Sequence, residues 1–267
     1  MLLNIDSLSI NLCKDGKRLV QNISFSLQKG SSLVILGQSG SGKTLTCKTI
    51  TGILNRRSFK PDGKVFFEGY ELLAMTPKQQ RQIYGGQIAL IPQNPMTALN
   101  PSVRVGHQMA ETLRLHTGLK GDKAYIKLET ALREAGLNST GEIMKSYPHM
   151  LSGGMLQRVL IAMALMVDAK LIVADEPTTA LDAEHRNATV DTLIRQREQG
   201  TAIMLVTHDF AVASRMGGDL LVMKDGQVIE RGEVSSVLDT PKHPYTRALI
   251  EAAHLSGTVC ERRGLAC

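Results

Sequence analysis

The stretch from Gly37 to Thr44 has the composition and spacing of a phosphate-binding loop. It reads GQSGSGKT and fits the pattern G-x-x-x-x-G-K-[ST] at every position. Glycines let backbone N–H groups close around phosphate oxygens, Lys43 can reach the outer phosphates, and Thr44 can ligate Mg²⁺. An apolar run precedes the loop and a helical pattern follows it, which is the context that such a site requires. We expect the whole loop to contact nucleotide: Gly37, Gln38, Ser39, Gly40, Ser41, Gly42, Lys43 and Thr44.

Further polar residues follow other apolar runs. The run LIVADEP ends in Asp175 and Glu176, and ligands of a parallel sheet bind at the carboxyl ends of its strands. There Asp175 would hold Mg²⁺ through water, and Glu176 would orient or deprotonate an attacking water. His208 in LVTHD could donate a hydrogen bond to a terminal phosphate, whereas charge assigns no role to Gln93 in LIPQNP. Taken alone, the acids could equally be solvated groups before a proline turn, and His208 a surface group; the neighbouring loop favours phosphoryl transfer.

A second segment, MLSGGMLQR, also has the features of an anion-binding helix start. Ser152, Gly153 and Gly154 open an apolar run of helical character. Free N–H groups and the positive end of the helix dipole would face an anion there. The alternative is a tight helix cap without a ligand. The residues alone do not explain why one chain would carry two such helix starts but only one loop lysine.

The elements that must position these residues alternate between strands and helices. LLNIDSLSINL, NISFSL, SLVILG, GKVFFEG and QIALIPQ predict strands, as do KLIVADEP, TAIMLVTHD and DLLVMKDGQVIERG later in the chain. Between them, residues from about 95 to 167 show only helical periods. This order predicts an α/β fold with a mostly parallel sheet covered on both faces. We expect one domain over 1–235, with a core of 1–94 and 168–235, a helical lobe at about 95–167, and a short C-terminal extension, 236–267, that contains a helix at YTRALIEAAHL.

Composition narrows the class of protein. The net charge of +6 over 267 residues suits anionic partners, but no basic block with interleaved aromatics predicts nucleic-acid binding. The longest apolar run, Val159 to Val167, is too short to span a bilayer, and the first residues do not resemble a signal peptide. We therefore expect a soluble chain whose membrane role would need partners. The four cysteines form no CxxC pair and are expected to be reduced thiols: Cys13, Cys47, Cys260 and Cys267.

These motifs together resemble those of the ATP-binding cassette (ABC) ATPases. The phosphate loop, LIPQNP, LSGGMLQR, LIVADEP, TTALD and LVTHD follow the order and rough spacing of that family over nearly the whole chain. LSGGMLQR is the most specific, because other P-loop proteins lack it. The resemblance implies a RecA-like P-loop NTPase core, an antiparallel β subdomain and an inserted α-helical lobe, with ATP and Mg²⁺ as cofactors. It implies that Glu176, His208 and Gln93 are catalytic, that Thr44, Gln93 and Asp175 hold Mg²⁺, and that Asp182 belongs to the D-loop.

The resemblance also implies a function for the second helix start. ABC subunits pair head to tail, so this segment would contact ATP held by the loop of the other subunit. The residues expected to do so are Leu151, Ser152, Gly153, Gly154 and Gln157. Many relatives stack an aromatic residue on adenine, but here the corresponding stretch is INLCKDGKR. We expect Leu12 and Cys13 to make an apolar contact in its place.

Finer features resemble one branch of the importers. QNPMTALNP and PKHPYTRALIEA are similar to the oligopeptide, dipeptide and nickel importer ATPases, and LTCKT, KSYPHMLSGGMLQR and ADEPTTALD to the first ATPase subunit of nickel and metallophore importers. This implies a heterodimer with a second ATPase (or a homodimer in isolation), two permeases, and indirectly an extracellular solute-binding protein, at the cytoplasmic face of the membrane. A peptide importer is the alternative. ABC proteins of DNA repair or translation carry inserts that this sequence lacks.

Overall fold

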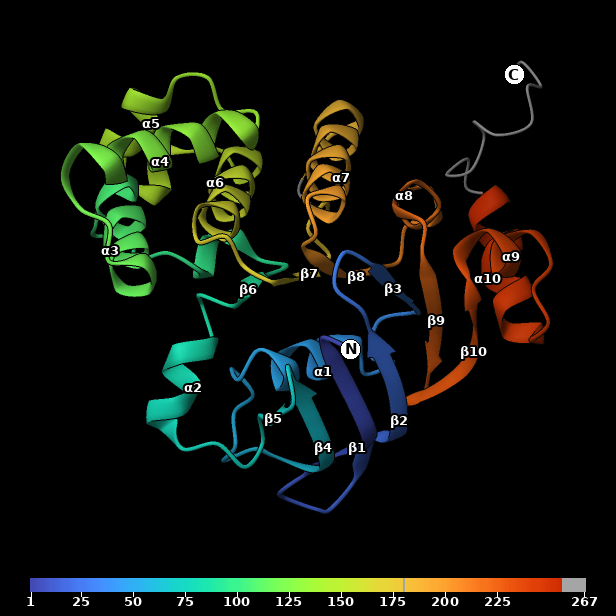
Figure 1. Ribbon diagram of the computed structural model, residues 1–267. Coiled ribbons are helices and arrows are strands. Elements are labelled where there is room, and N and C mark those ends of the chain that lie inside the picture. The colour runs from blue at the N-terminus through green and yellow to red at the C-terminus, as the bar shows by residue number, and fades with distance from the viewer. Residues whose placement is uncertain (180, 256–267) are drawn as a thin grey trace.

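A six-stranded sheet forms the centre of the computed structural model, which describes residues 1–179 and 181–255 (Figure 1). The strand order is β10-β9-β3-β8-β7-β6. Five strands run parallel, and β10 alone pairs antiparallel with β9. The mostly parallel sheet predicted from the sequence is therefore confirmed. The strands are β3 (Ser32–Leu36), β6 (Ile88–Ile91), β7 (Leu171–Asp175), β8 (Ala202–Thr207), β9 (Asp219–Lys224) and β10 (Gln227–Glu233).

A second, antiparallel sheet has the order β2-β1-β4-β5 and lies below the first in Figure 1. Its strands are β1 (Leu3–Leu12), β2 (Arg18–Leu27), β4 (Phe59–Phe67) and β5 (Tyr70–Glu71). Leu3 and Ile5 are buried while the intervening Asn4 is partly exposed, as expected for a sheet with one face on the core. This sheet is the antiparallel β subdomain implied by the family resemblance.

One set of helices forms a separate lobe. The helical lobe lies between β6 and β7 in sequence and to one side of the sheet (Figure 1). It contains η1 (Pro95–Thr97), α3 (Val105–Thr117), α4 (Gly121–Glu134), α5 (Thr140–Lys145), η2 (Pro148–Met150) and α6 (Gly153–Met166). The remaining helices are α1 (Lys43–Ile50), α2 (Pro77–Ile83), α7 (Ala183–Glu198), α8 (Phe210–Met216), α9 (Val234–Asp239) and α10 (Pro244–Leu255).

The two faces of the central sheet are buried in different hydrophobic cores. On β3, Leu33 and Ile35 pack with the antiparallel sheet and α1. Val34 and Leu36 belong to the core that joins α7, α8 and the helical lobe. Because both faces are covered, all five residues of β3 are buried, which explains why the four residues after Ser32 are a continuous apolar run rather than an alternating one.

The C-terminal segment is part of the core rather than an appendage. The predicted boundary between residues 235 and 236 falls inside α9, and the division into a domain and an extension stays a prediction. Val234, Val237 and Ile250 are buried in the same core as α8, because α9 and α10 present apolar faces to the sheet. Residues 256–267, with Cys260 and Cys267, lie outside the described residues.

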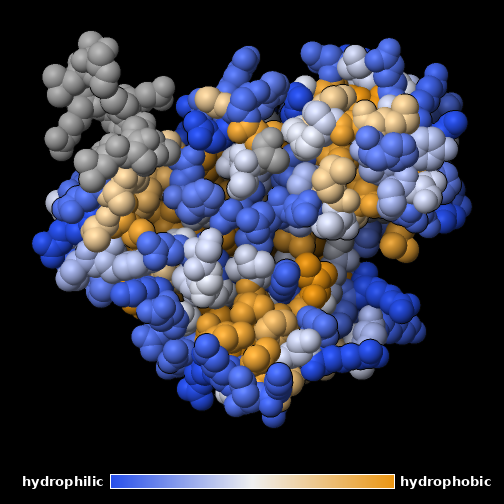
Figure 2. Space-filling model, turned by 180° about the vertical axis from the view of Figure 1, so that it is seen from behind, coloured by the Kyte–Doolittle hydropathy of each residue, from blue (hydrophilic) through white to orange (hydrophobic). Residues whose placement is uncertain are grey.

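The face of the molecule in Figure 2 carries mostly polar side chains. Seen from behind, hydrophobic side chains gather in the lower half of the molecule, below the helical lobe (Figure 2). Within residues 1–179 and 181–255, no helix has the length and apolar character needed to cross a bilayer.

Candidate active site

The P-loop, residues 37–44, connects β3 to α1 along a path that needs glycine. A Cβ added at Gly37 would lie 2.3 Å from the carbonyl oxygen of Met223. Gly42 is the N-cap of α1 with φ of 100°, and it supplies no side-chain cap. The first N–H groups of α1 thus lack an intrahelical partner and a capping side chain. Such N–H groups, with the positive end of the helix dipole, favour an anion.

Lys43 supplies a buried positive charge at this loop. Its side chain is largely enclosed, and its Nζ donates to the carbonyl oxygens of Gly37 at 2.6 Å and Gln38 at 2.8 Å. Burial lowers the pKa of Lys43, although the charges of Glu176 and Asp175 oppose the shift. No carboxylate of the described chain lies within ion-pair distance of the ammonium. A phosphate would supply the missing negative charge, so the loop fits a nucleotide phosphate.

Asp175 lies beside α1 at the end of β7 and is buried. Thr44 Oγ1 donates a hydrogen bond to Asp175 Oδ1 at 3.3 Å. Burial raises the pKa of Asp175, and the hydrogen bond from Thr44 opposes that shift. In the described chain no three His, Cys, Asp or Glu side chains cluster as a metal site of their own. One carboxylate and one hydroxyl fit Mg²⁺ that is shared with phosphates, where the ion would neutralise charge on the phosphate oxygens.

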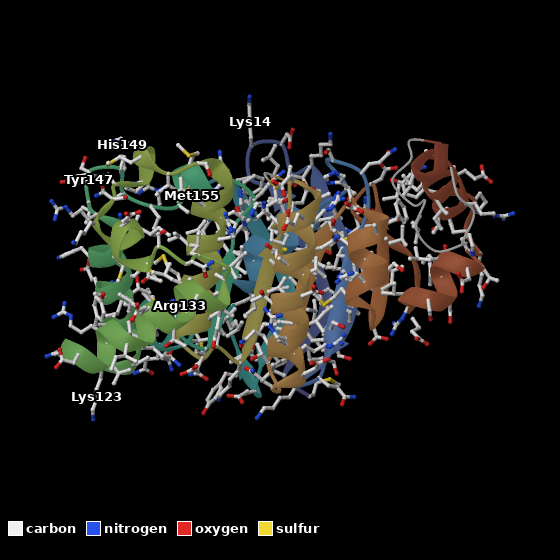
Figure 3. The ribbon with its side chains drawn as sticks, turned by 90° about the horizontal axis from the view of Figure 1, so that it is seen from above. Lys14, Lys123, Arg133, Tyr147, His149 and Met155 are labelled. Atoms are coloured by element: carbon white, nitrogen blue, oxygen red, sulfur yellow. The ribbon has the colours of Figure 1, made fainter. Side chains whose placement is uncertain are left out.

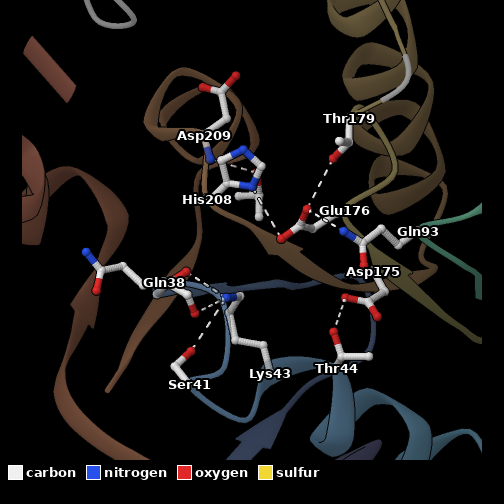
Figure 4. A network of polar contacts seen from close by, with 12 residues as sticks. Gln38, Ser41, Lys43, Thr44, Gln93, Asp175, Glu176, Thr179, His208 and Asp209 are labelled. Carbon is white, nitrogen blue, oxygen red and sulfur yellow. Dashed lines mark hydrogen bonds and ion pairs between the residues drawn. The ribbon is translucent and has the colours of Figure 1, made fainter. Parts of the chain in front are cut away.

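Glu176 is the centre of a polar network (Figure 4). Its carboxylate accepts hydrogen bonds from Gln93 Nε2 at 3.0 Å and Thr179 Oγ1 at 3.2 Å, and lies 3.3 Å from His208 Nδ1. Its φ of 49° is uncommon for a residue with a side chain, and its N–H donates to the Val206 carbonyl at 2.9 Å. The carboxylate is thereby held where the ends of β6, β7 and β8 meet. A carboxylate so placed can orient water or accept its proton.

Asp209 supports His208, and the sequence analysis did not single it out. Its carboxylate caps α8 by accepting from the N–H groups of Ala211 at 2.8 Å and Val212 at 3.2 Å. Its other oxygen accepts from Arg186 Nη1 at 3.0 Å. These bonds fix the turn between β8 and α8, from which His208 projects. The signal in the sequence was an Asp immediately before a helical pattern, which is a common N-cap.

The second predicted helix start lies at the N-terminus of α6. Ser152 is its N-cap and accepts from the N–H of Met155 at 3.2 Å. Ser152 is exposed, and Gly153 and Gly154 are partly exposed. No hydrogen bond within the described chain joins this helix start to the P-loop. The chain therefore has two separate helix starts, at α1 and at α6, and anion binding by the second stays a prediction.

Aromatic contacts fix the segment that leads into α6. The rings of Tyr147 and His149 stack with centroids 5.7 Å apart, and both lie at the outer end of the helical lobe (Figure 3). The guanidinium of Arg104 lies 5.8 Å from the Tyr147 ring centroid. Because Arg104 is the N-cap of α3, these contacts tie the start of α6 to another helix of the lobe.

The side chain of Gln157 points into the lobe, and its predicted contact with the partner's nucleotide stays a prediction. We predicted that it would contact nucleotide together with Ser152, but its side chain is buried one turn into α6. Its Nε2 points toward the carbonyl of Pro92 at 3.5 Å, beside Gln93. Leu151 is also buried. Ser152 is exposed at this helix start and Met155 is partly exposed, whereas the positions four and five residues after Ser152 turn toward the lobe core.

Three further predicted residues lie away from this network. Asp182 is the N-cap of α7, where it accepts from the His185 N–H at 2.9 Å; hydrogen bonds from the His185 backbone and ring lower the pKa of Asp182. Leu12 ends β1 half-buried, and Cys13 is exposed. The described contacts place Val20 against the loop instead, since its Cγ2 would lie 2.9 Å from a Cβ on Gly42. Adenine contact by Leu12 and Cys13 stays a prediction.

The fold and this network define a class of P-loop nucleotide hydrolases, and comparisons with known proteins agree. The family described as ABC transporter matches residues 20–179, and the chain belongs to that family. It is 37% identical over 254 residues to the dipeptide transport ATP-binding protein DppD of Escherichia coli K12, covering 94% of this chain and 78% of DppD. It is 39% identical over 250 residues to the metal-staphylopine import system ATP-binding protein CntD of Staphylococcus aureus, covering 93% and 92%.

Comparison with solved structures also finds ATP-binding cassettes. A dimeric structure of the ATP-binding cassette MJ0796 in a post-hydrolysis state with ADP and Pi matches with a TM-score of 0.78 at 25% identity, covering 87% of this chain and 99% of that one. The chain is the ATP-binding subunit of an ABC importer and an ATPase, with ATP and Mg²⁺ as its cofactors. As an importer subunit it works with membrane permease subunits.

Proposed function

We propose that this chain hydrolyses ATP to drive uptake of nickel or of a metal–metallophore complex. The observation that carries the proposal is the similarity to CntD, which extends over nearly the whole of both chains. The similarity to DppD supports a second candidate, uptake of a dipeptide or oligopeptide. The cargo does not contact an ATP-binding subunit, so no side chain described above selects between the two.

In the proposed reaction, water attacks the γ-phosphorus of ATP, and the bond from that phosphorus to the bridging oxygen breaks to give ADP and phosphate. Lys43 and the P-loop N–H groups hold the phosphates, and Glu176 accepts the proton of the water. Gln93 and His208 both contact the Glu176 carboxylate, so they would align the base and respond to the terminal phosphate. Thr44 and Asp175 would hold Mg²⁺, and Gln93 would be a further ligand.

The second anion-binding helix start would complete the site of another subunit. Ser152, Gly153 and Gly154 would bind the terminal phosphate of ATP held by the partner's P-loop, and Asp182 would lie at the same interface. The exposure of this helix start and its separation from the P-loop support the arrangement. Each chain then supplies one half of each of the two composite sites. Closure of the dimer therefore depends on ATP, and hydrolysis lets the dimer reopen. We propose a heterodimer with a second, homologous ATPase; a homodimer would form in isolation.

A cavity beside the network could receive a permease segment. It has a volume of about 540 Å³ and is lined by Gln93, Asp175, Leu99 and Met163, among others. Ile53 lies at this cavity and is 54% exposed. A permease helix at the outer part of this cavity, beside Ile53 and Leu99, would contact the segment that carries Gln93, and would so couple transport to the Glu176 network while Thr44 and Asp175 keep Mg²⁺. The chain would thus lie at the cytoplasmic face of the membrane, with a solute-binding protein on the opposite side and no nucleic-acid partner.

Uptake in the native host tests the cargo. The gene is deleted, and uptake of radiolabelled nickel, with and without a chelating metallophore, is measured beside uptake of a labelled dipeptide. Loss of metal uptake alone, restored by the wild-type gene but not by Lys43→Ala, is the expected result. Loss of dipeptide uptake alone would reject the metal proposal and favour the second candidate.

A further inference from the structure

The segment 241–246, which carries the motif PKHPYT, reaches the P-loop. The hydroxyl of Tyr245 accepts a hydrogen bond from the Gln38 N–H at 3.4 Å. The ring of the same residue lies 4.9 Å from Lys224 Nζ at the end of β9. The reaction described above uses neither Tyr245 nor Lys224. Tyr245 nevertheless joins the C-terminal helix to the loop that binds phosphate.

The Gln38 N–H and the carbonyl that accepts from Lys43 belong to the same peptide group, Gly37–Gln38. The Gly37 carbonyl accepts from Lys43 Nζ at 2.6 Å, while the N–H of the Gly37–Gln38 peptide donates to Tyr245. Because a peptide group is planar, its orientation about the chain sets both bonds together. A hydroxyl that holds the N–H therefore also holds the carbonyl that positions the lysine ammonium, and hydrogen bonds in such a chain strengthen one another.

Glu230 on β10 fixes the backbone of the segment. Its carboxylate accepts from the N–H groups of Lys242 at 2.7 Å and His243 at 3.1 Å. The His243 Nδ1 accepts in turn from the Tyr245 N–H at 3.1 Å. Burial alone would raise the pKa of Glu230, but the hydrogen bonds that it accepts from this segment outweigh that and lower it. These hydrogen bonds thus hold the turn at the start of α10 that carries the Tyr245 ring.

The β9–β10 hairpin also contacts the P-loop directly. The Gly226 N–H donates to the Ser41 carbonyl at 3.2 Å, and Gly37 lies so close to Met223 that no side chain fits between them. Both anchors of Tyr245, Lys224 and Glu230, belong to this hairpin. The hairpin and the start of α10 therefore form one support for the P-loop.

We propose that Tyr245 is a positioning residue that sets the orientation of the Gly37–Gln38 peptide, and through it the Lys43 ammonium, for ATP binding. The inference rests on the proposed role of Lys43 in holding phosphate. It gives the C-terminal segment a part in nucleotide affinity in addition to its packing on the core.

The test compares full-length Tyr245→Phe with the wild type. The Phe variant keeps the ring on Lys224 and removes only the hydroxyl. Loss of one long hydrogen bond is expected to raise the Kd for a fluorescent ATP analogue and the KM for ATP about two- to fivefold, with kcat nearly unchanged. Amide hydrogen exchange of residues 37–41 in the nucleotide-free chain should become faster. Tyr125→Phe is the matched control, because Tyr125 is exposed on α4 in the helical lobe, and it should match the wild type in every measurement.

Two outcomes would overturn the inference. In the first, Tyr245→Phe keeps the wild-type Kd and the wild-type exchange of residues 37–41. In the second, the variant loses kcat and affinity in proportion to a fall in Tm, which indicates a general packing role. Glu230→Gln, which loosens the same turn from a distance, should reproduce the rise in KM without touching the ring. Failure of the proposed function is distinguishable, since Lys43→Ala would then bind ATP like the wild type.

Discussion

Replacing Glu176 by Gln tests the chemistry of the network most sharply. The substitution keeps the length of the side chain. In the wild type, Gln93 Nε2 and Thr179 Oγ1 lie 3.0 and 3.2 Å from the Glu176 carboxylate, and the amide oxygen of the variant can still accept from both. It removes the negative charge beside His208 and the ability to accept a proton. A positioned general base contributes about 10²- to 10⁴-fold to a rate, or about 3–5 kcal/mol of barrier. Turnover should therefore fall at least about a hundredfold.

ATP binding should survive this change, because Lys43 and Thr44 are untouched. The assay is phosphate release under steady state, with the Kd of a fluorescent ATP analogue measured on the same preparation. Glu184→Gln is the matched control, since Glu184 is an exposed acid in the first turn of α7 outside the network. Wild-type turnover in Glu176→Gln would refute the assignment of the base. Loss of binding with an intact fold would show instead that the carboxylate holds the nucleotide.

Two other residues give further predictions. Asp209→Ala removes the α8 cap and the partner of Arg186, so the free energy of unfolding, measured with urea, should fall by about 1–2 kcal/mol. Because His208 loses its support, kcat should fall more than the affinity for ATP in steady-state kinetics. The pKa of Glu230 is lowered from 4.5, so its stabilisation is complete above that pH and is lost as the pH falls through the folded-state value. The difference in unfolding free energy between wild type and Glu230→Gln should accordingly shrink as the pH falls below 4.5; a difference that stays constant at low pH would contradict the assigned cause.

The sequence predicted the site where the chemistry is carried by short motifs at strand ends. Asp175 ends β7, His208 directly follows β8, and Lys43 begins the helix after β3; parallel strands bring their carboxyl ends to one edge of the sheet. Glu176 was predicted for the same reason, although its left-handed backbone was not. Local pattern was sufficient because each of these residues is fixed by its own strand.

The residues whose surroundings the sequence did not predict depend on contacts between distant segments. Gln157 belongs to a helix start that was recognised correctly, but the rotation of α6 against the Gln93 segment, 65 residues away, decides that its side chain is buried. The contact of Tyr245 with Gln38 spans 207 residues. No periodicity within one window encodes which loop a C-terminal helix will touch. An Asp directly before a helix predicts an N-cap, so the cap at Asp209 could have been predicted, whereas its ion pair with Arg186 could not.

The most direct measurement of the central claim is ATP binding by the full-length Ser152→Arg chain, with turnover measured on the same sample. Ser152 is exposed at the start of α6, so Arg fits without disturbing the core, and Ser152→Asn serves as the control that keeps a capping oxygen. If the two helix starts serve two different composite sites, Ser152→Arg binds ATP at its own P-loop with an affinity within about twofold of the wild type, but turnover is lost. If the variant stays folded and its own binding vanishes, the two helix starts serve one site within a single chain, and the head-to-tail account is wrong.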